Sequence, residues 1–438
     1  MENPACHRRR LRRLFAELGD GVLLLPTARE QHRNGDVLQE YRPGSDFHFL
    51  TGFPEPEAVL VASRRGARQH TVLFVRPRDP AREIWDGPRY GVRGAASAFG
   101  VDEALPVQEL WRRLPELLQG HVRLFHRLGV DRDFDHRLLD LFAAQAVKHK
   151  RRQPAAHPVI EDPVPALARL RLAKDADELE ALRRAALITA AGHHAAMVAA
   201  RPGMFEYEVQ TVVEGAFRRS GSPRNGYPSI VASGKNACVL HYHDNDRRLR
   251  AGDLLLIDAG AEFHGNTADI TRTFPVSGRF TPPQAAVYRA VLKAQLAGIR
   301  ACRLGAPWDA AHKTCIRWLT KGLVELGVLR GDVGRLVAKE KFKPWYMHGT
   351  SHWLGRDVHD VGAYVGSDGK PERLVAGAVL TVEPGLYFGA GDRRVPAALR
   401  GIGVRIEDDV LVTRAGPEVL TAAAPKTIAE VEAACRRS

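Results

Sequence analysis

Two ten-residue stretches of this chain, AGDLLLIDAG and AGAVLTVEPG, align without gaps, so that Asp258 falls on Glu383. Each stretch runs from apolar residues into an acid and is followed by a second strand-like segment that carries another. These second acids are Asp269 in TADITRTFPV and Glu407 in GVRIEDDVLV. The repetition predicts two related halves, each a strand pair with one acid per strand. Duplication of this kind places a site where the halves meet.

In the first strand pair, the two acids are expected to lie close enough to repel each other. Gly265 and Asn266 favour a turn within EFHGN. Asp258 and Asp269 would then be cross-strand neighbours with Cβ atoms about 5 Å apart. Two carboxylates that close in an apolar setting repel, unless one is protonated or a cation neutralises both. The alternative is that each aspartate only caps a helix or shapes a turn.

Histidines accompany the acids. MHGTSHWLGRDVHD carries His348, His352 and His359, and VLHYHDND carries His241 ahead of the first acidic strand. Four carboxylates with an imidazole suit a pair of divalent cations, and histidine is also the natural acid or base near neutral pH. A separation of about 3.5–4 Å lets one carboxylate bridge two ions.

Other histidines have plainer interpretations. His243 is the competing candidate in the VLHYHDND stretch. His193 and His194 lie in the middle of a predicted helix without an acidic partner, so both are expected to be structural.

Length and charge bound the remaining possibilities. A chain of 438 residues exceeds one ordinary core, so two domains are expected. No apolar run approaches the 18 residues of a membrane-spanning helix, and no secretory signal is predicted. The net charge of +13 raises nucleic-acid binding as an alternative, but no basic motif interleaved with aromatic residues supports it. Five scattered cysteines without a CxxC pair favour a reducing compartment, the cytoplasm.

Residues up to 170 alternate strand-like runs such as GVLLLP and HTVLFV with helical stretches, which predicts an α/β domain. The Pro-rich RRQPAAHPVIEDPVPALARLR is expected to be a linker. A long amphipathic helix follows, with Asp175 or Asp177 as its cap.

The four acids and the histidine follow one another along the chain in an order that resembles a known family. Their order matches the five metal ligands of the pita-bread metallopeptidases, here Asp258, Asp269, His352, Glu383 and Glu407. MHGTSHWLGRDVHDVG, LTVEPGLYF and RGIGVRIEDDVLVT closely resemble bacterial Xaa-Pro aminopeptidases (aminopeptidase P). RNGDVLQEYRPGSDFHFLTGFPEPEAVLV also resembles the N-terminal domain of that family, which methionine aminopeptidases lack.

The resemblance implies an α/β (α+β) fold of two domains. Residues 1–170 would form a creatinase/aminopeptidase-P-like α/β domain. Residues 171–438 would form a catalytic pita-bread domain with pseudo-twofold duplicated halves.

The resemblance also implies a role for each ligand. The five residues would hold two divalent ions, usually Mn²⁺ in this family, with Zn²⁺ or Co²⁺ as alternatives. Asp269 and Glu407 would bridge the ions, and a hydroxide between them would attack the carbonyl before proline. Glu383 would also carry a proton from that water to the leaving proline nitrogen.

Residues outside the ligand set are implied as well. His241 and His359 would stabilise the tetrahedral intermediate and contact the substrate. The other side chains that line the site in relatives are His348, Tyr387 and Arg405. Arg405 should share a strand face with Glu407, and a plain charge pair between them is the alternative.

The resemblance also extends to two residues of the N-terminal domain, Asp36 and Trp85. In relatives, their counterparts reach toward the substrate's amino end or a neighbouring subunit's site. The resemblance thus implies a homo-oligomer, a dimer or a tetramer. The alternative is a Trp85 packed inside its own domain.

The function predicted from the sequence is hydrolysis that releases the N-terminal residue from peptides with proline in second position. One alternative is a prolidase restricted to Xaa-Pro dipeptides. The other is a metal-free peptide- or nucleic-acid-binding module on the same fold. No nucleic acid and no membrane is expected among the partners.

Overall fold

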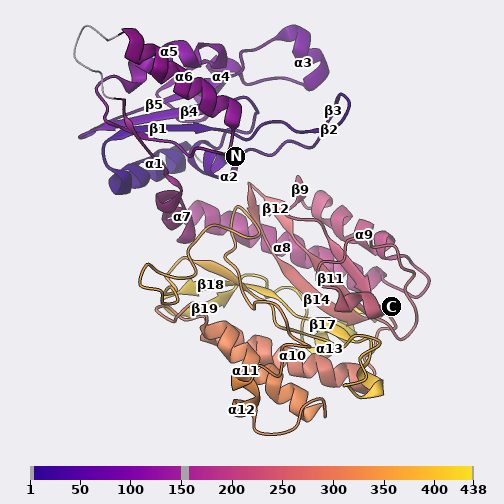
Figure 1. The fold of residues 1–438 in the computed structure, drawn as a ribbon. Helices are drawn as coiled ribbons and strands as arrows, with labels where there is room; N and C mark the ends of the chain where they lie inside the picture. Colours follow the sequence, from indigo (N-terminus) through magenta and orange to yellow (C-terminus); the bar gives the residue numbers. More distant parts are fainter. Residues whose placement is uncertain (1–3, 149–156, 437–438) are drawn as a thin grey trace. The chain divides into compact units, whose positions relative to one another are not determined.

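The computed structural model describes residues 4–148 and 157–436. The chain forms two compact units, residues 1–170 and 171–438, each shown in Figure 1. Both units contain helices and strands, which confirms the predicted mixed α/β class. Among the described residues, no helix has the length and apolar character that crossing a bilayer requires.

The N-terminal unit is built on a six-stranded sheet of order β6-β5-β4-β1-β7-β8. Its strands are β1 (Gly21–Pro26), β4 (Val59–Arg65), β5 (Arg68–Val75), β6 (Glu103–Pro106), β7 (Arg123–Phe125) and β8 (Val159–Glu161). A separate hairpin pairs β2 (His32–Asn34) with β3 (Val37–Leu38). Its helices are α1 (Pro4–Leu18), α2 (Ser45–Thr51), α3 (Pro80–Asp86), α4 (Gly91–Ala98), α5 (Leu110–Leu118), α6 (Arg132–Lys148) and α7 (Val164–Leu172).

Both faces of this sheet are covered. Leu23 of β1 packs into a core shared with α1, α2 and α4, whereas Val22 and Leu24 pack into a second core with α5 and α6. Successive strand residues point to opposite faces, so an uninterrupted apolar strand such as GVLLLP fits only between two helical layers.

The stretch expected to be a linker is largely structured, and that prediction was wrong for the residues that the structure describes. It contributes β8 to the sheet and most of α7, while residues 151–156 lie outside the described part. Pro165 is tolerated because it sits in the first turn of α7, where a backbone N–H has no helical partner.

A cavity of about 680 Å³ lies at the carboxyl ends of the parallel strands β1, β7 and β8. Arg29 at its edge is paired with Asp131 and Asp133 of the α6 N-terminus. None of the predicted site residues lines this cavity.

Among the described residues, the C-terminal unit contains three three-stranded antiparallel sheets, β10-β11-β14, β13-β12-β9 and β15-β18-β19, and the two-stranded pairing of β16 with β17. The strands are β9 (Arg224–Asn225), β10 (Ile230–Ser233), β11 (Leu254–Ala259), β12 (Ala261–Phe263), β13 (Asn266–Thr267), β14 (Ile270–Pro275), β15 (Val379–Val382), β16 (Gly385–Tyr387), β17 (Gly403–Arg405), β18 (Asp408–Thr413) and β19 (Gly416–Val419). The helices are α8 (Ala176–Ala199), α9 (Glu206–Arg219), α10 (Pro282–Ala301), α11 (Ala310–Glu325), α12 (Val333–Ala338) and α13 (Ile428–Ala434).

The helices pack in pairs around these strands, α8 with α9 and α10 with α11 (Figure 1). Asp175 caps α8 through a capping box with Glu178, which decides between the two predicted caps. His193 is buried in α8, where its Nε2 lies 3.1 Å from the Ala259 carbonyl oxygen. This contact gives His193 the structural role predicted for it.

The predicted pairing of acidic strands is present in both halves, β11 with β14 and β15 with β18. The register of the first pair differs from the prediction, because Asp258 pairs with Thr271 and not with Asp269. The turn is centred on His264 and Gly265, both with positive φ, and this shifts the ladder by two residues. Asp269 is therefore a diagonal neighbour on the same face as Asp258.

The second half keeps a directly opposed pair of acids. Val382 pairs with Asp408 at the end of β15, and Gly385 pairs with Arg405 in β16 and β17. The register is the same on both sides of the gap between these ladders, so Glu383 faces Glu407.

Candidate metal centre

The acids from both halves meet around one histidine. Asp269, His352 and Glu407 each offer a ligand atom, and these atoms lie within 4.8 Å of one another. His352 Nε2 is 3.4 Å from Asp269 Oδ2 and 3.8 Å from Glu383 Oε1. Asp258 joins this group through Tyr227, whose hydroxyl donates to carboxylate oxygens of both Asp258 and Asp269. The structure therefore brings all five predicted ligand residues together.

His352 is held in place by its own strand neighbours. Its backbone N–H donates to Thr381 Oγ1, and its carbonyl accepts from the Thr381 N–H at 3.0 Å. Its Nδ1 lies 3.0 Å from the Trp353 carbonyl oxygen, which turns Nε2 toward the acids. An imidazole that donates through one nitrogen to a carbonyl presents the other as a ligand.

Burial and mutual repulsion raise the pKa values of the acids in this group. Burial, followed by the nearby charge of Asp258, raises the pKa of Asp269. Burial also raises the pKa of Glu383 to about 7, and burial with Asp269 and Glu383 nearby raises the pKa of Glu407 well above its usual value. Burial would lower the pKa of His352, but its hydrogen bond to Asp269 raises that pKa to about 9.

These features fit divalent metal ions. Four carboxylates and one imidazole offer several oxygens and one nitrogen, the donor set that borderline and hard divalent cations take. Within this group only Arg405, and His352 when protonated, supply positive charge. The remaining negative charge is what bound cations would neutralise.

Arg405 approaches the acids from β17. Its Nη2 donates to Asp258 Oδ2 at 2.5 Å, its Nε to Thr271 Oγ1 at 3.1 Å and its Nη1 to Tyr387 Oη at 3.3 Å. The alternative of a plain charge pair with Glu407 is wrong, because the carboxylate partner is Asp258. Arg405 and Glu407 do share a strand face, since both side chains meet Thr271 Oγ1.

The other predicted histidines surround the acids. His348 Nε2 lies 2.8 Å from Tyr387 Oη, and its Nδ1 lies 3.6 Å from Glu383 Oε2. Burial and the charge of Arg405 lower the pKa of His348 to about 3, so its imidazole is neutral. The ring of His359 contacts His352 edge to face at 4.4 Å, and burial followed by His352 lowers the pKa of His359.

His241 lies close enough to His348 and His359 that, when protonated, it would lower the pKa of both. Its ring is exposed and stacks with that of His243 at 6.4 Å. His243 remains the neighbouring candidate that the sequence could not separate from it.

The sequence-based prediction missed two residues of the site, Tyr227 and Thr271. Tyr227 precedes β10 in a short loop, where no local pattern marks it. Thr271 had a usable signal, because a strand residue two positions from Asp269 shares its face. Thr271 Oγ1 donates to Glu407 Oε2 at 2.6 Å, across the junction of the two halves.

The two residues predicted from the N-terminal domain belong to the other unit. Asp36 is exposed in the turn of the β2–β3 hairpin, and Trp85 on α3 is 83% exposed. A Trp85 packed inside its own domain, the alternative interpretation, is wrong.

Sequence comparison now decides the family. The family model of metallopeptidase family M24 matches residues 180–414, more than half of the chain, and that range contains all five predicted ligand residues. The chain belongs to metallopeptidase family M24. The N-terminal domain of aminopeptidase P matches residues 7–125, which assigns the N-terminal unit. This M24 protein therefore carries both domains that the resemblance implied.

Full-length relatives of this M24 protein are Xaa-Pro aminopeptidases. The Xaa-Pro aminopeptidase of Haemophilus influenzae is 43% identical, over 96% of this chain and 94% of its own. The structure of aminopeptidase PepP from Pseudomonas aeruginosa matches with a TM-score of 0.96 and 45% identity, over 99% of this chain and 98% of the other. Zn-substituted Escherichia coli aminopeptidase P in complex with product matches with a TM-score of 0.95 and 41% identity, over 100% and 99%. The predicted resemblance is confirmed.

Proposed function

We propose that this protein is an Xaa-Pro aminopeptidase, which hydrolyses the bond before a proline in second position and releases the N-terminal residue. One observation carries the proposal: a cluster of four carboxylates and an imidazole lies in a chain that aligns almost end to end with enzymes of that name. The two M24 halves supply these residues from separate strand pairs.

Five residues would hold the metal, namely Asp258, Asp269, His352, Glu383 and Glu407. We infer two ions, with Asp269 and Glu407 as the shared ligands and Mn²⁺ preferred over Zn²⁺ or Co²⁺. Bound ions of this kind polarise a carbonyl and lower the pKa of water.

The chain's own groups would move the proton and hold the substrate. Glu383 has a pKa of about 7 without metal, so its carboxylate can exchange a proton near neutral pH. The leaving nitrogen of an Xaa-Pro bond belongs to a tertiary amide and must gain a proton, which Glu383 would deliver. His241 and His359 would contact the substrate and the oxyanion. Neutral His348, bonded to Tyr387, would line the same side of the site.

We also propose a homo-oligomer in which Asp36 and Trp85 serve a neighbouring subunit's site or the substrate's amino end. The support is a set of exposed apolar side chains on the N-terminal unit, with Ile84 at 82% and Trp85 at 83% exposure on α3, and Val37 at 51% on the β2–β3 hairpin. Light scattering would give the subunit number. Trp85→Ala should weaken association or raise KM while leaving the metal content unchanged.

A cytoplasmic location is the further proposal, and five free cysteines support it. Nucleic acid is not proposed as a partner.

A substrate-length series with defined metals tests the activity. Cleavage of Xaa-Pro-Xaa tripeptides and longer peptides supports an aminopeptidase, whereas strict preference for Xaa-Pro dipeptides would make the protein a prolidase. Asp269→Asn should lose bound metal and activity together, while Asp368→Asn, at an exposed pair with Lys370, should keep both. Full activity of Asp269→Asn after chelation would contradict a metal mechanism.

A further inference from the structure

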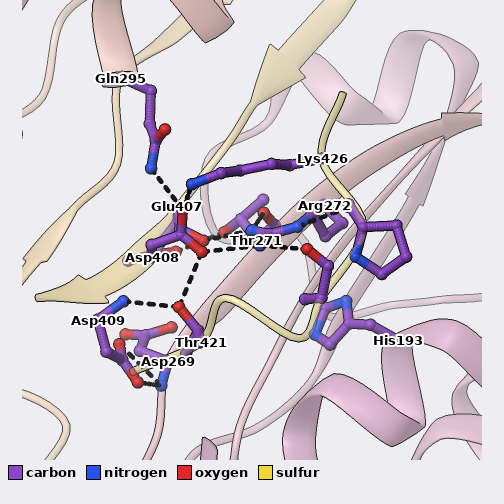
Figure 2. Close-up of polar contacts among 12 residues, drawn as sticks. His193, Asp269, Thr271, Arg272, Gln295, Glu407, Asp408, Asp409, Thr421 and Lys426 are labelled. Atoms are coloured by element: carbon purple, nitrogen blue, oxygen red, sulfur yellow. Dashed lines mark hydrogen bonds and ion pairs between the residues drawn. The ribbon is translucent and has the colours of Figure 1, made fainter. Parts of the chain in front are cut away.

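A buried ion cluster lies directly behind Glu407. Its members are Asp408, Arg272, Lys426, Gln295 and Thr421, and we name it the Asp408 cluster (Figure 2). The proposed metal site lies on one face of the segments that carry Thr271 and Glu407, whereas the Asp408 cluster lies on the other face. Residues 407 and 408 are consecutive and therefore point to opposite faces, as do residues 271 and 272.

The carboxylate of Asp408 is fully satisfied. Its Oδ1 accepts from Arg272 Nη2 at 2.7 Å and from Thr421 Oγ1 at 2.8 Å. Its Oδ2 accepts from Gln295 Nε2 at 2.7 Å and from Lys426 Nζ at 2.5 Å. These donors come from β14, from α10 and from the segment between β19 and α13, so one carboxylate joins three parts of the unit.

Arg272 uses its donors on the same segments. Besides Asp408, its guanidinium donates to the backbone carbonyls of Pro425 and Ala424 near the chain's end, at 3.0 and 3.1 Å. Its Nη1 donates to the carbonyls of Thr271 and Glu407. A lysine could not reproduce this set, because it has three donors at one point where arginine has five in a planar fork.

Glu407 is thereby fixed at three places by two adjacent residues. Its N–H donates to the Thr271 carbonyl at 3.1 Å, and its carbonyl accepts from Arg272. Its carboxylate accepts from Thr271 Oγ1. The cluster therefore holds both the backbone of Glu407 and the strand that carries Thr271.

We propose that the Asp408 cluster is a positioning device for Glu407, through which Lys426 and the segment of residues 421–426 set the affinity of the site for its divalent ions. The inference rests on the proposed role of Glu407 as a metal ligand. None of the cluster residues would touch metal or substrate. They act through the Glu407 backbone and through Thr271.

Lys426 is the residue to change, because its side chain is 17% exposed and the others are completely buried. Lys426→Met removes one cation and keeps the aliphatic stem, whereas Lys426→Arg keeps the charge. Arg247→Met is the matched control: that side chain is 19% exposed, and it pairs with Asp253 in the same unit without contacting Glu407. Gln295→Met is the second test variant, because the amide oxygen of Gln295 has no hydrogen-bond partner in the described structure.

The readout is the affinity of the metal-free full-length protein for Co²⁺, by competition with a chromophoric chelator, together with the visible absorption of bound Co²⁺. Lys426→Met and Gln295→Met should each bind Co²⁺ about tenfold more weakly and shift its absorption bands, which is the scale of effect for residues that orient ligands. Lys426→Arg should restore the affinity, and Arg247→Met should match the unmodified chain.

Two outcomes separate the failure of this inference from that of the proposed function. If Glu407→Gln lowers Co²⁺ binding but both cluster variants bind like Arg247→Met, the cluster is merely structural and the inference is overturned. If Glu407→Gln leaves Co²⁺ binding unchanged, the proposed ligand set itself is wrong.

Discussion

Asp258 and Arg405 lie 147 positions apart in the chain and form a buried ion pair, with Arg405 Nη2 at 2.5 Å from Asp258 Oδ2. The pair joins a strand of the first half to a strand of the second. Removing one partner of a buried pair leaves the other charge uncompensated, which is costly. Bound cations would supply that compensation instead.

Arg405→Met should therefore destabilise the metal-free protein more than the metal-loaded one. Methionine removes the positive charge and the hydrogen bonds to Asp258, Thr271 and Tyr387, so we expect a loss of about 3 kcal/mol without metal and clearly less with it. Thermal unfolding with and without chelator measures both. Arg394→Met, at an exposed guanidinium, should lose the same small amount in both states, and an equal loss for Arg405→Met in both states would contradict the expectation.

Tyr227→Phe tests the hydroxyl that donates to Asp258 and Asp269. Without this donor the charged form of Asp269 is less stabilised, so protons compete better with metal. We expect about tenfold weaker metal binding at neutral pH, with little change in fold. Tyr242→Phe is the control, since its hydroxyl bonds to Glu206. Unchanged metal affinity in Tyr227→Phe would show that its hydroxyl does not orient the acids.

Metal binding should release protons. In the metal-free protein the pKa of His352 is about 9 and that of Glu383 about 7, whereas metal requires neutral imidazole and ionised carboxylate. The apparent affinity should therefore rise between pH 6 and pH 9. Calorimetric titration in two buffers of different ionisation heat checks this. Equal binding enthalpies in both buffers would exclude proton release.

The metal-free protein should lose stability as the pH rises from 7 to 9. The folded pKa of His352 is raised from 6.5 to about 9, so its stabilising contribution is complete below pH 6.5 and is lost as the pH rises through 9. We expect a decrease on the order of 2 kcal/mol in the free energy of unfolding. Urea unfolding at each pH measures it. His352→Gln should flatten the slope, and a slope that survives this change would assign it to another group.

Gly260→Ala should disrupt the first strand pair. A Cβ there would collide with the Ala268 carbonyl oxygen and come within 2.9 Å of the Tyr227 ring. Overpacking of this kind costs roughly 3 kcal/mol and would displace Tyr227. Gly389→Ala is the control, because nothing lies within 4 Å of its Cβ position. Differential scanning calorimetry should show a lower Tm for Gly260→Ala alone.

The sequence predicted the acid-bearing strand pairs because apolar runs that end in carboxylates repeat at matching positions. It could not give the register of the first pair, since His264 adopts a positive φ that few non-glycine residues take. The turn centre moves by one residue, and the partner of Asp258 moves by two. Asp258 and Asp269 share a face in either register, so the predicted site survived the error.

The hydrogen-bond and ion-pair partners of Asp258 depend on tertiary packing and could not be predicted from the sequence. Tyr227 reaches Asp258 from the loop between β9 and β10, and Arg405 could not be assigned to Asp258 rather than Glu407 from spacing alone. Strand periodicity correctly placed Arg405 and Glu407 on one face. When several carboxylates lie near one arginine, tertiary packing determines which of them it pairs with, and the local sequence pattern does not predict this.

The dependence of Arg272 on the carbonyls of Ala424 and Pro425 has a consequence for synthesis of the chain. All five proposed ligands have left the ribosome's catalytic centre before Lys426 is made, yet Asp408 lacks one of its four donors until then. A nascent or truncated chain that ends before residue 424 would contain every ligand and still bind metal poorly. Peptidase activity would thus depend on synthesis having passed residue 426.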